Sequence, residues 1–218
     1  MINPYPINSV SHLHFVDTTT STNLLLNEMV DNNRKNGVFL PDFFCVVANY
    51  QTAGRGQGKK TWHSNKGENL LVSFYFQPQI LPPQQIYFNY FFALTVRKVI
   101  SKYANDVKIK KPNDIWVGDK KIAGILIEHF IQGDTLNYTI AGVGININQT
   151  QFDASLPNPV SLKLITNKNL SREAILEELI ETGKGYYQKF KSGAFAELEG
   201  EYEAFTFSTS TPLLACRI

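Results

Sequence analysis

The chain has 218 residues, a length that suits one large domain or a domain with a small appendage. Hydrophobic residues make up 43% of it and charged residues 18%, which is typical of folded globular proteins and excludes a disordered or collagen-like chain. Its 21 basic and 19 acidic residues leave a net charge of +2, so the chain has no general attraction for nucleic acid or anionic lipid, and any anion site must be local.

The cysteines and the N-terminal segment indicate the compartment. Cys45 and Cys216 form neither a CxxC pair nor a disulfide framework, which is typical of proteins in a reducing compartment. The first twenty residues lack the basic region followed by an apolar stretch that marks a signal peptide. No apolar run approaches the roughly 20 residues that a membrane helix needs. We therefore expect a cytoplasmic protein without a membrane partner.

The first half of the chain combines strands with helices. In chain order, its apolar patterns predict a strand over residues 14–16, a helix opening at residue 21, a strand over 43–48, a strand over 70–76 and a helix over 84–103. Thr20 or Ser21 is expected to cap the first helix, because hydroxyl side chains accept hydrogen bonds from the free backbone N–H groups there. A polar loop over residues 52–67, rich in Gly and Lys, separates the second strand from the third.

The second half predicts an antiparallel meander followed by a helix. Its four strands are expected over residues 107–110, 115–117, 122–130 and 136–147. Gly118-Asp119 and Gly133-Asp134 are turn signals between successive strands. Ser171 then opens a helix that ends near Phe190. Together the elements predict an α+β fold, in which helices pack against a mixed or antiparallel sheet.

The polar loop contains a candidate anion site. The segment Gly54-Arg55-Gly56-Gln57-Gly58-Lys59-Lys60 places three glycines among three cations directly after a buried strand. Glycine lets backbone N–H groups approach an anion, and Arg and Lys donate charge-assisted hydrogen bonds to phosphate or carboxylate. A solvated turn is the commoner explanation when such a segment stands alone. A P-loop is excluded, because Ala53 replaces its first glycine, Lys60 replaces its Ser or Thr, and a strand follows where a helix should.

Further motifs accompany this loop. In chain order the set is Thr20-Ser21-Thr22-Asn23, then Gln51 with the glycine loop and Trp62, then Lys110-Lys111-Pro112-Asn113-Asp114, then Lys121-Ile122-Ala123-Gly124-Ile125-Leu126, and finally Gly142-Val143-Gly144-Ile145-Asn146. This series resembles the biotin protein ligase family, whose motifs STN, QxxGRGxxGxxW, KxPND, KxAGIL and GxGIN follow the same order. The resemblance runs from about Phe15 to Asn148, and it is specific because five short motifs in one order rarely coincide by chance.

The resemblance implies a catalytic domain with the class II synthetase-like fold of biotin and lipoate ligases. It implies that ATP activates the biotin carboxylate as biotinyl-5'-AMP, which then acylates one lysine of the biotin carboxyl carrier protein domain of a biotin-dependent carboxylase. Biotin and ATP are thus the expected substrates, with Mg²⁺ bound to ATP. No metal site of the protein's own is expected, because His12, His14 and His129 lack a spaced ligand partner, and His63 in the polar loop is a candidate for contact with the ligand and not for binding a metal.

The matching positions imply roles for individual residues. The expected catalytic residues are Lys121, Arg55 and Asp114. The expected biotin-binding residues are Ser21, Thr22, Asn23, Gln51, Gly54, Arg55, Gly56, Gln57, Lys121 and Gly124. The expected ATP-binding residues are Arg55, Trp62, Lys110, Asn113, Lys121 and Asn146. The residues alone also allow plainer roles: an N-cap pair at positions 21 and 22, a turn at positions 113 and 114, and a tryptophan that only covers the core.

Three departures from the family pattern affect these expectations. Gln57 stands where the family usually has a second Arg, so weaker retention of biotinyl-AMP is expected. About twenty residues precede the STN motif, so neither a helix-turn-helix nor a DNA partner is expected. We assign residues 1–190 to the catalytic domain and residues 191–218 to a helical tail with a reduced or missing SH3-like domain. A monomer and a homodimer are both open.

Two other functions remain open on the sequence. A lipoate or octanoate ligase or transferase would share the fold, but such proteins usually carry an RxxGGGxVxH loop that this chain lacks. An inactive relative that binds only a nucleotide or the carrier would keep the fold without the chemistry.

Overall fold

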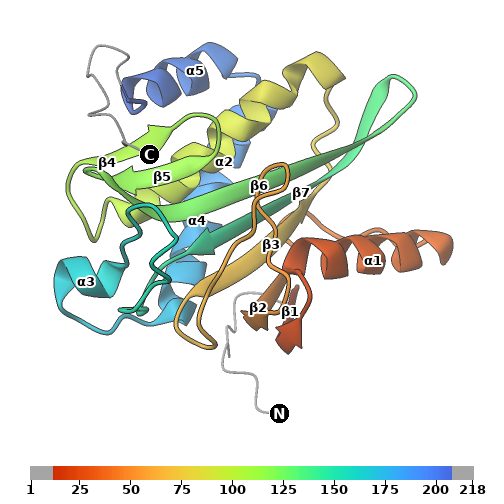
Figure 1. The fold of residues 1–218 in the computed structure, drawn as a ribbon. Coiled ribbons are helices and arrows are strands. Elements are labelled where there is room, and N and C mark those ends of the chain that lie inside the picture. Colours follow the sequence, from red (N-terminus) through yellow and green to blue (C-terminus); the bar gives the residue numbers. More distant parts are fainter. Residues whose placement is uncertain (1–11, 208–218) are drawn as a thin grey trace.

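Seven strands form one mixed sheet in the computed structural model, which describes residues 12–207 (Figure 1). The strands are β1 (Leu13–Thr19), β2 (Cys45–Gln51), β3 (Leu70–Phe76), β4 (Val107–Lys110), β5 (Asp114–Val117), β6 (Lys120–Gln132) and β7 (Thr135–Ile145). Their order across the sheet is β1-β2-β3-β7-β6-β5-β4, in which β1 and β2 are parallel and every other neighbouring pair is antiparallel. The predicted α+β fold and the antiparallel meander from β4 to β7 are confirmed.

Helices accompany the sheet throughout the described residues. They are α1 (Thr22–Lys35), the short 3-10 helix η1 (Pro82–Gln84), α2 (Gln85–Ile100), α3 (Leu162–Thr166), α4 (Arg172–Lys191) and α5 (Phe195–Ala204). The sequence patterns predict α1, α2 and α4, and α5 lies within the expected helical tail. α3 is not predicted, because it spans only 5 residues.

Side-chain alternation along β3 divides the interior into two layers. Val72, Phe74 and Phe76 belong to the main core, together with residues of α2 and α4. Because successive strand residues point to opposite faces, Ser73 and Tyr75 lie on the other side, where α1 packs. Every residue of β3 is buried, as expected of a strand that is covered on both faces.

On its side of the sheet, α1 covers β2, β3 and β7. Its residues Leu26 and Val30 form one apolar cluster with Val46, Tyr75 and Ile140. The loop between β2 and β3 lies in front of the same sheet face, beside the N-terminal end of α1 (Figure 1). Residues of the sheet, the start of α1 and this loop line one cavity.

The C-terminal helix α5 packs against α2, where Tyr202 stacks on Tyr90 with ring centroids 4.2 Å apart. Leu198 and Tyr202 both belong to the main core. The domain boundary expected at residue 190 stays a prediction, and residues 208–218 of the expected tail lie outside the described residues. None of the helices within residues 12–207 is long and apolar enough to span a membrane.

A half-buried histidine makes the stability of the fold depend on pH. The ring nitrogens of His129 on β6 lie 2.9 Å from Thr139 Oγ1 and 3.1 Å from Asn89 Oδ1. Burial among these groups lowers the pKa of His129 from its usual 6.5 to about 4. Between these two values the unfolded chain binds more protons at this site than the folded protein does. Acidification through this window therefore destabilises the fold.

We predict that His129→Gln reduces the loss of stability between pH 7 and pH 4.5, because glutamine can keep a hydrogen bond to these neighbours but does not titrate. Urea unfolding of the parent and the variant at both pH values measures the effect. An equal loss of stability in the two proteins would contradict the role given to His129.

Candidate active site

A cavity of about 750 Å³ occupies the space between the sheet, the start of α1 and the loop after β2. Three glycines form its floor: Gly124 on β6, and Gly142 and Gly144 on β7. Gly124 is paired with Gly144 across the two strands, and Gly142 is paired with Ser73 on β3. All four residues point to the same face of the sheet, because paired residues in neighbouring strands share a face.

The glycines are required by the side chains that lie on them. A Cβ atom at Gly142 would stand 2.1 Å from Asn23 Oδ1, and one at Gly144 would stand 2.4 Å from Cε2 of Trp62. A Cβ atom at Gly124 would stand 2.8 Å from Cζ3 of the same indole. The floor therefore admits Asn23 and Trp62 only because these positions lack side chains, which explains the GxGIN pattern in physical terms.

One end of the cavity is lined by hydroxyl and amide groups. Gln51 Oε1 accepts hydrogen bonds from the Thr22 backbone N–H at 2.7 Å and from the Thr22 hydroxyl at 3.1 Å. Ser73 Oγ lies 2.7 Å from Thr22 Oγ1 and 2.5 Å from Asn23 Oδ1. Ser21 precedes α1 as expected, but its side chain makes no capping hydrogen bond, so the predicted cap is wrong and its hydroxyl lines the cavity instead.

Ser73 is a fully buried member of this network that the motifs did not identify. It is the one polar residue in the strand segment Leu70–Phe76, and its partners on α1 are 50 and 51 positions away in the sequence. A lone serine in a strand that is otherwise apolar or aromatic was the available signal.

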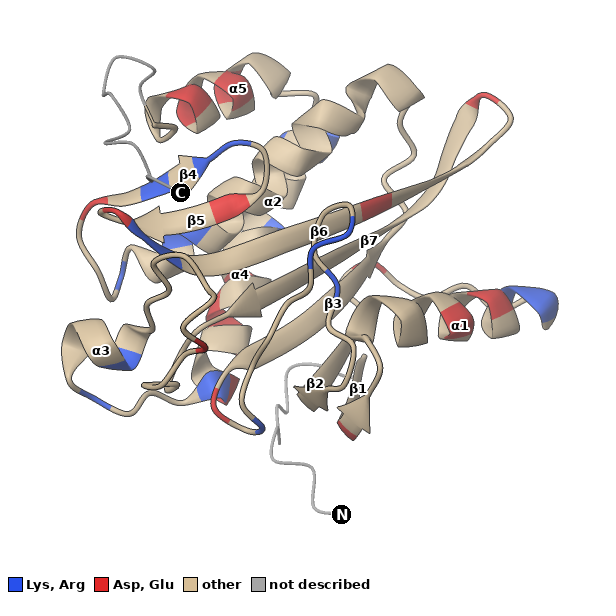
Figure 2. Cartoon of the chain, in the orientation of Figure 1, with Lys and Arg blue, Asp and Glu red and all other residues tan. Residues whose placement is uncertain are grey.

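Glu128 is a second residue that the motifs missed. It accepts hydrogen bonds from Arg55 Nη1 at 3.1 Å and from Asn23 Nδ2 at 2.8 Å, and its Oε1 lies 2.9 Å from Arg55 Nη2. Figure 2 shows a single acidic stretch in the middle of β6, with the loop after β2 crossing the sheet beside it. Arg55 is thus held at the same end of the cavity as Asn23.

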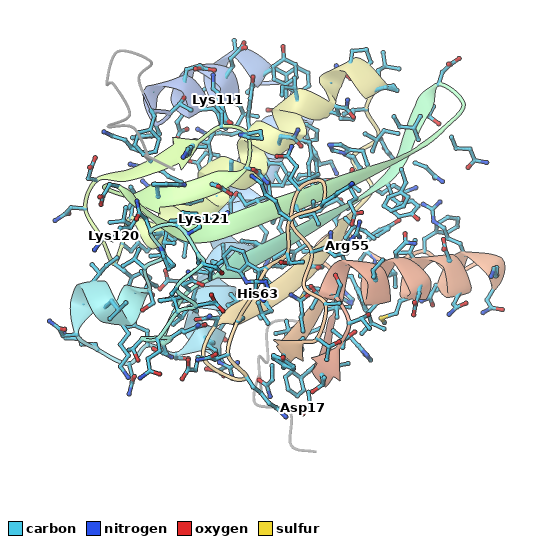
Figure 3. All side chains as sticks on the ribbon, viewed as in Figure 1. Asp17, Arg55, His63, Lys111, Lys120 and Lys121 are labelled. Carbon is cyan, nitrogen blue, oxygen red and sulfur yellow. The ribbon has the colours of Figure 1, made fainter. Side chains whose placement is uncertain are left out.

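The other end of the cavity carries two lysines. Lys121 Nζ lies 2.7 Å from Asp114 Oδ1 and 5.6 Å from the centre of a Trp62 ring. Lys110 Nζ lies 4.0 Å from the centre of a Trp116 ring and has no carboxylate partner within residues 12–207. Figure 3 shows Lys121 at one end of β6 and Arg55 farther along the same face of the sheet. Lys110 is therefore uncompensated at the lysine end, and Lys59 and Lys60 of the glycine loop, which also line the cavity, have no ion-pair partner in the described part of the chain either.

Two expected ATP-binding residues also hold the walls of the cavity. Asn113 donates its side-chain N–H to Ile125 O at 2.8 Å, and its own backbone oxygen accepts from Ile125 N–H at 2.8 Å. Asn146 is 4% exposed and donates to Val160 O at 3.1 Å. Both amides line the cavity while they fix neighbouring backbone.

The glycine loop folds back on itself as a closed turn. Trp62 N–H donates to Gly54 O at 2.9 Å, and Gly56 N–H donates to Lys60 O at 2.8 Å. A Cβ atom at Gly54 would stand 2.3 Å from Trp62 O, so this position needs glycine for the close backbone approach. The turn directs Trp62 into the cavity, where its indole Nε1 is buried without a hydrogen-bond partner in the described part of the chain.

The expected site residues come together, with one exception. Ser21, Thr22, Asn23, Gln51, Arg55, Gly56, Gln57, Trp62, Lys110, Asn113, Asp114, Lys121, Gly124 and Asn146 all line the cavity. Gly54 does not line it but lies behind Trp62, next to a smaller hollow of about 310 Å³. The contacts of all these residues with biotin or ATP stay predictions.

Comparison with known proteins gives a biotin/lipoate protein ligase family and relatives that are named as ligases. Residues 15–146 match the model of the biotin/lipoate A/B protein ligase family. The chain is 28% identical over 210 residues to the bifunctional ligase/repressor BirA of Bacillus spizizenii, covering 94% of this chain and 62% of that protein. It is 31% identical over 170 residues to the chloroplastic biotin–protein ligase 1 of Arabidopsis thaliana, covering 75% and 46%. The chain thus spans less than two thirds of the length of these relatives.

Solved structures share the fold. The biotin protein ligase of Aquifex aeolicus, in complex with biotin and ATP, superimposes with a TM-score of 0.74 at 25% identity, over 90% of this chain and 79% of that one. The biotin protein ligase of Leishmania major, in complex with biotin, superimposes with a TM-score of 0.70 at 24% identity, over 95% and 85%. At 24% identity, the similarity to the Leishmania major protein concerns the fold alone.

We predict that Gly144→Ala displaces the Trp62 indole from the sheet, at a cost to stability of roughly 1 to 3 kcal/mol for overpacking. In a Trp116→Phe background Trp62 is the only tryptophan, so iodide quenching of its fluorescence reports its exposure directly. Quenching is expected to rise.

The control is Gly200→Ala in α5, where an added Cβ meets no atom within 4 Å. This substitution should stabilise the helix by about 0.5 to 1 kcal/mol and leave quenching unchanged. Quenching that does not rise in Gly144→Ala would show that the indole does not rest on this glycine.

Proposed function

The chain belongs to the biotin/lipoate A/B protein ligase family, and from this premise we propose that it is a biotin protein ligase. It forms biotinyl-5'-AMP from biotin and ATP and transfers the biotinyl group to a lysine of a biotin carboxyl carrier protein domain. The Aquifex aeolicus protein of similar fold, which was solved with biotin and ATP, supports the same pair of substrates.

The observation that carries this proposal is the contrast between the two ends of the cavity. The hydroxyl and amide end suits the neutral ureido ring of biotin, which needs both donors and acceptors. The lysine end suits a carboxylate and a phosphate, because Lys110 there has no carboxylate partner within residues 12–207. Trp62 lies between the two ends on the glycine floor and offers a flat surface for a purine.

In the first step a biotin carboxylate oxygen attacks the α-phosphorus of ATP. A P–O bond forms to the carboxylate, and the bond to the β-phosphate breaks to release pyrophosphate. Both reactants are anions, so the Lys121 ammonium offsets the charge that accumulates as they approach. Asp114 holds that ammonium in the cavity until the substrates arrive.

In the second step the amine of the carrier lysine attacks the acyl carbon of biotinyl-AMP. An amide C–N bond forms, the C–O bond to AMP breaks, and the amine proton passes to solvent. Asp114 is 23% exposed, which leaves its carboxylate accessible to the side chain of the incoming carrier lysine. The protein thus contributes position and charge, and the mixed anhydride supplies the reactivity.

Magnesium enters with ATP in this proposal. Within residues 12–207 no group of three His, Cys, Asp or Glu side chains is placed to hold a metal ion. The phosphate oxygens of ATP are suitable ligands for Mg²⁺ and carry it into the site as MgATP.

A lipoate or octanoate ligase is not favoured, because a saturated acyl chain offers no partner to Ser21, Thr22, Asn23 and Gln51. Such a chain would displace water from this polar end of the cavity without replacing the hydrogen bonds that the water makes, which costs affinity. Pyrophosphate release measured with biotin, octanoate and lipoate in turn separates these activities. A relative that only binds nucleotide would release none with any of the three.

We predict that Lys121→Ala lowers biotin-dependent pyrophosphate release by about a hundredfold or more, since one preorganised electrostatic contact is removed. The matched control is Lys120→Ala, because Lys120 is the preceding residue of β6 and does not line the cavity (Figure 3). Release by the control should match the parent. A Lys121→Ala protein within a few-fold of the parent would rule out the role given to this lysine.

We also predict that Gln57→Arg slows the escape of biotinyl-AMP. Gln57 lines the cavity, and a guanidinium at this position would attract the phosphate. The attraction is on the order of 1 to 4 kcal/mol before desolvation and ordering costs. Labelling of bystander lysines, which depends on escaped intermediate, should fall while carrier modification stays similar. Unchanged bystander labelling would count against this account of Gln57.

A further inference from the structure

Glu128 is an acidic residue beside a cavity proposed to bind anions. It follows Gly124 and Leu126 at every second position of β6, so it points to the same face of the sheet as the glycine floor. Its side chain is 26% exposed and lies next to Asn23 and Arg55. A carboxylate here would repel the carboxylate and phosphates of the proposed substrates. Its presence therefore needs a reason.

The reason lies in its contacts with Arg55. The two oxygens of Glu128 face the two terminal nitrogens of Arg55 at 2.9 and 3.1 Å. Two parallel contacts fix the direction of a guanidinium as well as its distance. Arg55 comes from the loop after β2, and Glu128 belongs to a strand at the centre of the sheet. The pair ties the loop to the rigid part of the fold.

The contact with Asn23 fixes a second group. Asn23 Nδ2 donates to Glu128 Oε2 at 2.8 Å and to Leu126 O at 3.2 Å, so both donor positions of the amide are occupied. Asn23 Oδ1 then faces Ser73 Oγ. Glu128 therefore fixes the orientation of the Asn23 side-chain amide, with Nδ2 toward Glu128 and Oδ1 toward Ser73.

The ion pair also affects the charge of the cavity. Arg55 and Glu128 neutralise each other at the hydroxyl and amide end, whereas Lys110 at the lysine end has no carboxylate partner within residues 12–207. Lys59 and Lys60 also line the cavity, so the ion pair removes the charge of Arg55 and not that of the whole loop. An anionic group of a ligand is therefore attracted more weakly to Arg55 than to Lys110.

We infer that Glu128 is a positioning residue that holds Arg55 and Asn23 in place and neutralises the charge of Arg55 at this end of the cavity. The ring of the ligand then binds at this end and its carboxylate binds beside Lys121. The identity of the ligand as biotin rests on the proposed function, whereas the hold on Arg55 does not.

The variant Glu128→Gln tests this inference. Glutamine keeps an acceptor for Asn23 but loses the charge that binds Arg55. The control is Asp17→Asn, because Asp17 pairs with Lys66 at the base of the same loop, with Nζ and Oδ2 2.5 Å apart, and neither residue lines the cavity. The control thus removes an ion pair of the loop at a distance from the site.

Hydrogen exchange of residues 54–62 in the ligand-free protein measures the hold on the loop. For Glu128→Gln we expect exchange to be about three- to tenfold faster, the range for a half-exposed, two-contact ion pair. Asp17→Asn should exchange like the parent over these residues. The double variant Arg55→Gln/Glu128→Gln should exchange no faster than the faster single variant, since both remove one interaction. Parental exchange in Glu128→Gln would overturn the inference.

Kinetics of pyrophosphate release test the positioning of the ligand. Glu128→Gln should raise the KM for biotin by about three- to tenfold and leave kcat and the KM for ATP within about twofold of the parent values. A rise in the KM for ATP alone would place Arg55 at the phosphates and contradict the inference. If the parent does not turn over biotin, the proposed function fails, while hydrogen exchange still decides whether Glu128 holds Arg55.

Discussion

The cavity depends on a strip of the sheet that carries no side chains. Gly124, Gly142 and Gly144 present bare backbone on the face opposite the main core, and a Cβ at either of the two β7 positions would meet a cavity side chain at 2.1 or 2.4 Å. The same two strands turn Ala123, Ile125, Ala141, Val143 and Ile145 into the core on their other face. One pair of strands therefore supplies a rigid support and an open floor, which is the arrangement that a preorganised site needs.

Two ion pairs divide the open floor into chemically different halves. Asp114 holds Lys121, and Glu128 holds Arg55, so two of the three cations assigned to the site have a carboxylate partner from a strand. An anionic substrate must compete with Asp114 for Lys121, whereas Lys110 offers charge without competition. Because the carboxylates belong to β5 and β6, the polarity of the cavity is set by the sheet. The loop after β2 supplies the cation that Glu128 holds and the indole that covers the floor.

Local patterns in the sequence predict most of the architecture. The alternation over residues 70–76 and the turn signals at 118–119 and 133–134 predict strands that the structure contains, because burial of a strand face leaves a period of two. The motifs predict most of the lining residues through their resemblance to a family, but not Trp116, Phe152 or residues 155–159, which also line the cavity. Gly54 is the exception among the expected site residues. It does not line the cavity, and its lack of a side chain allows the close approach of its backbone to Trp62.

Long-range contacts explain what the sequence does not predict. The hydrogen bonds from Arg55 to Glu128 and from Ser73 to Asn23 join residues that are 73 and 50 positions apart. No local pattern reports such partners, so Glu128 looks like one more charge on a strand and Ser73 like an interruption in an apolar run. The expected cap at Ser21 is wrong for a related reason. Residues of α1, β2 and β3 form the polar network beside it, and the hydroxyl that would cap α1 lines the cavity.

Mass spectrometry of a biotin carboxyl carrier protein domain tests the central claim most directly. The domain is incubated with this protein, MgATP and either biotin, octanoate or lipoate. The account predicts a mass gain of one biotinyl group on a single lysine with biotin, and no gain with the other two acids. No gain with biotin, or acylation by octanoate or lipoate instead, would contradict it.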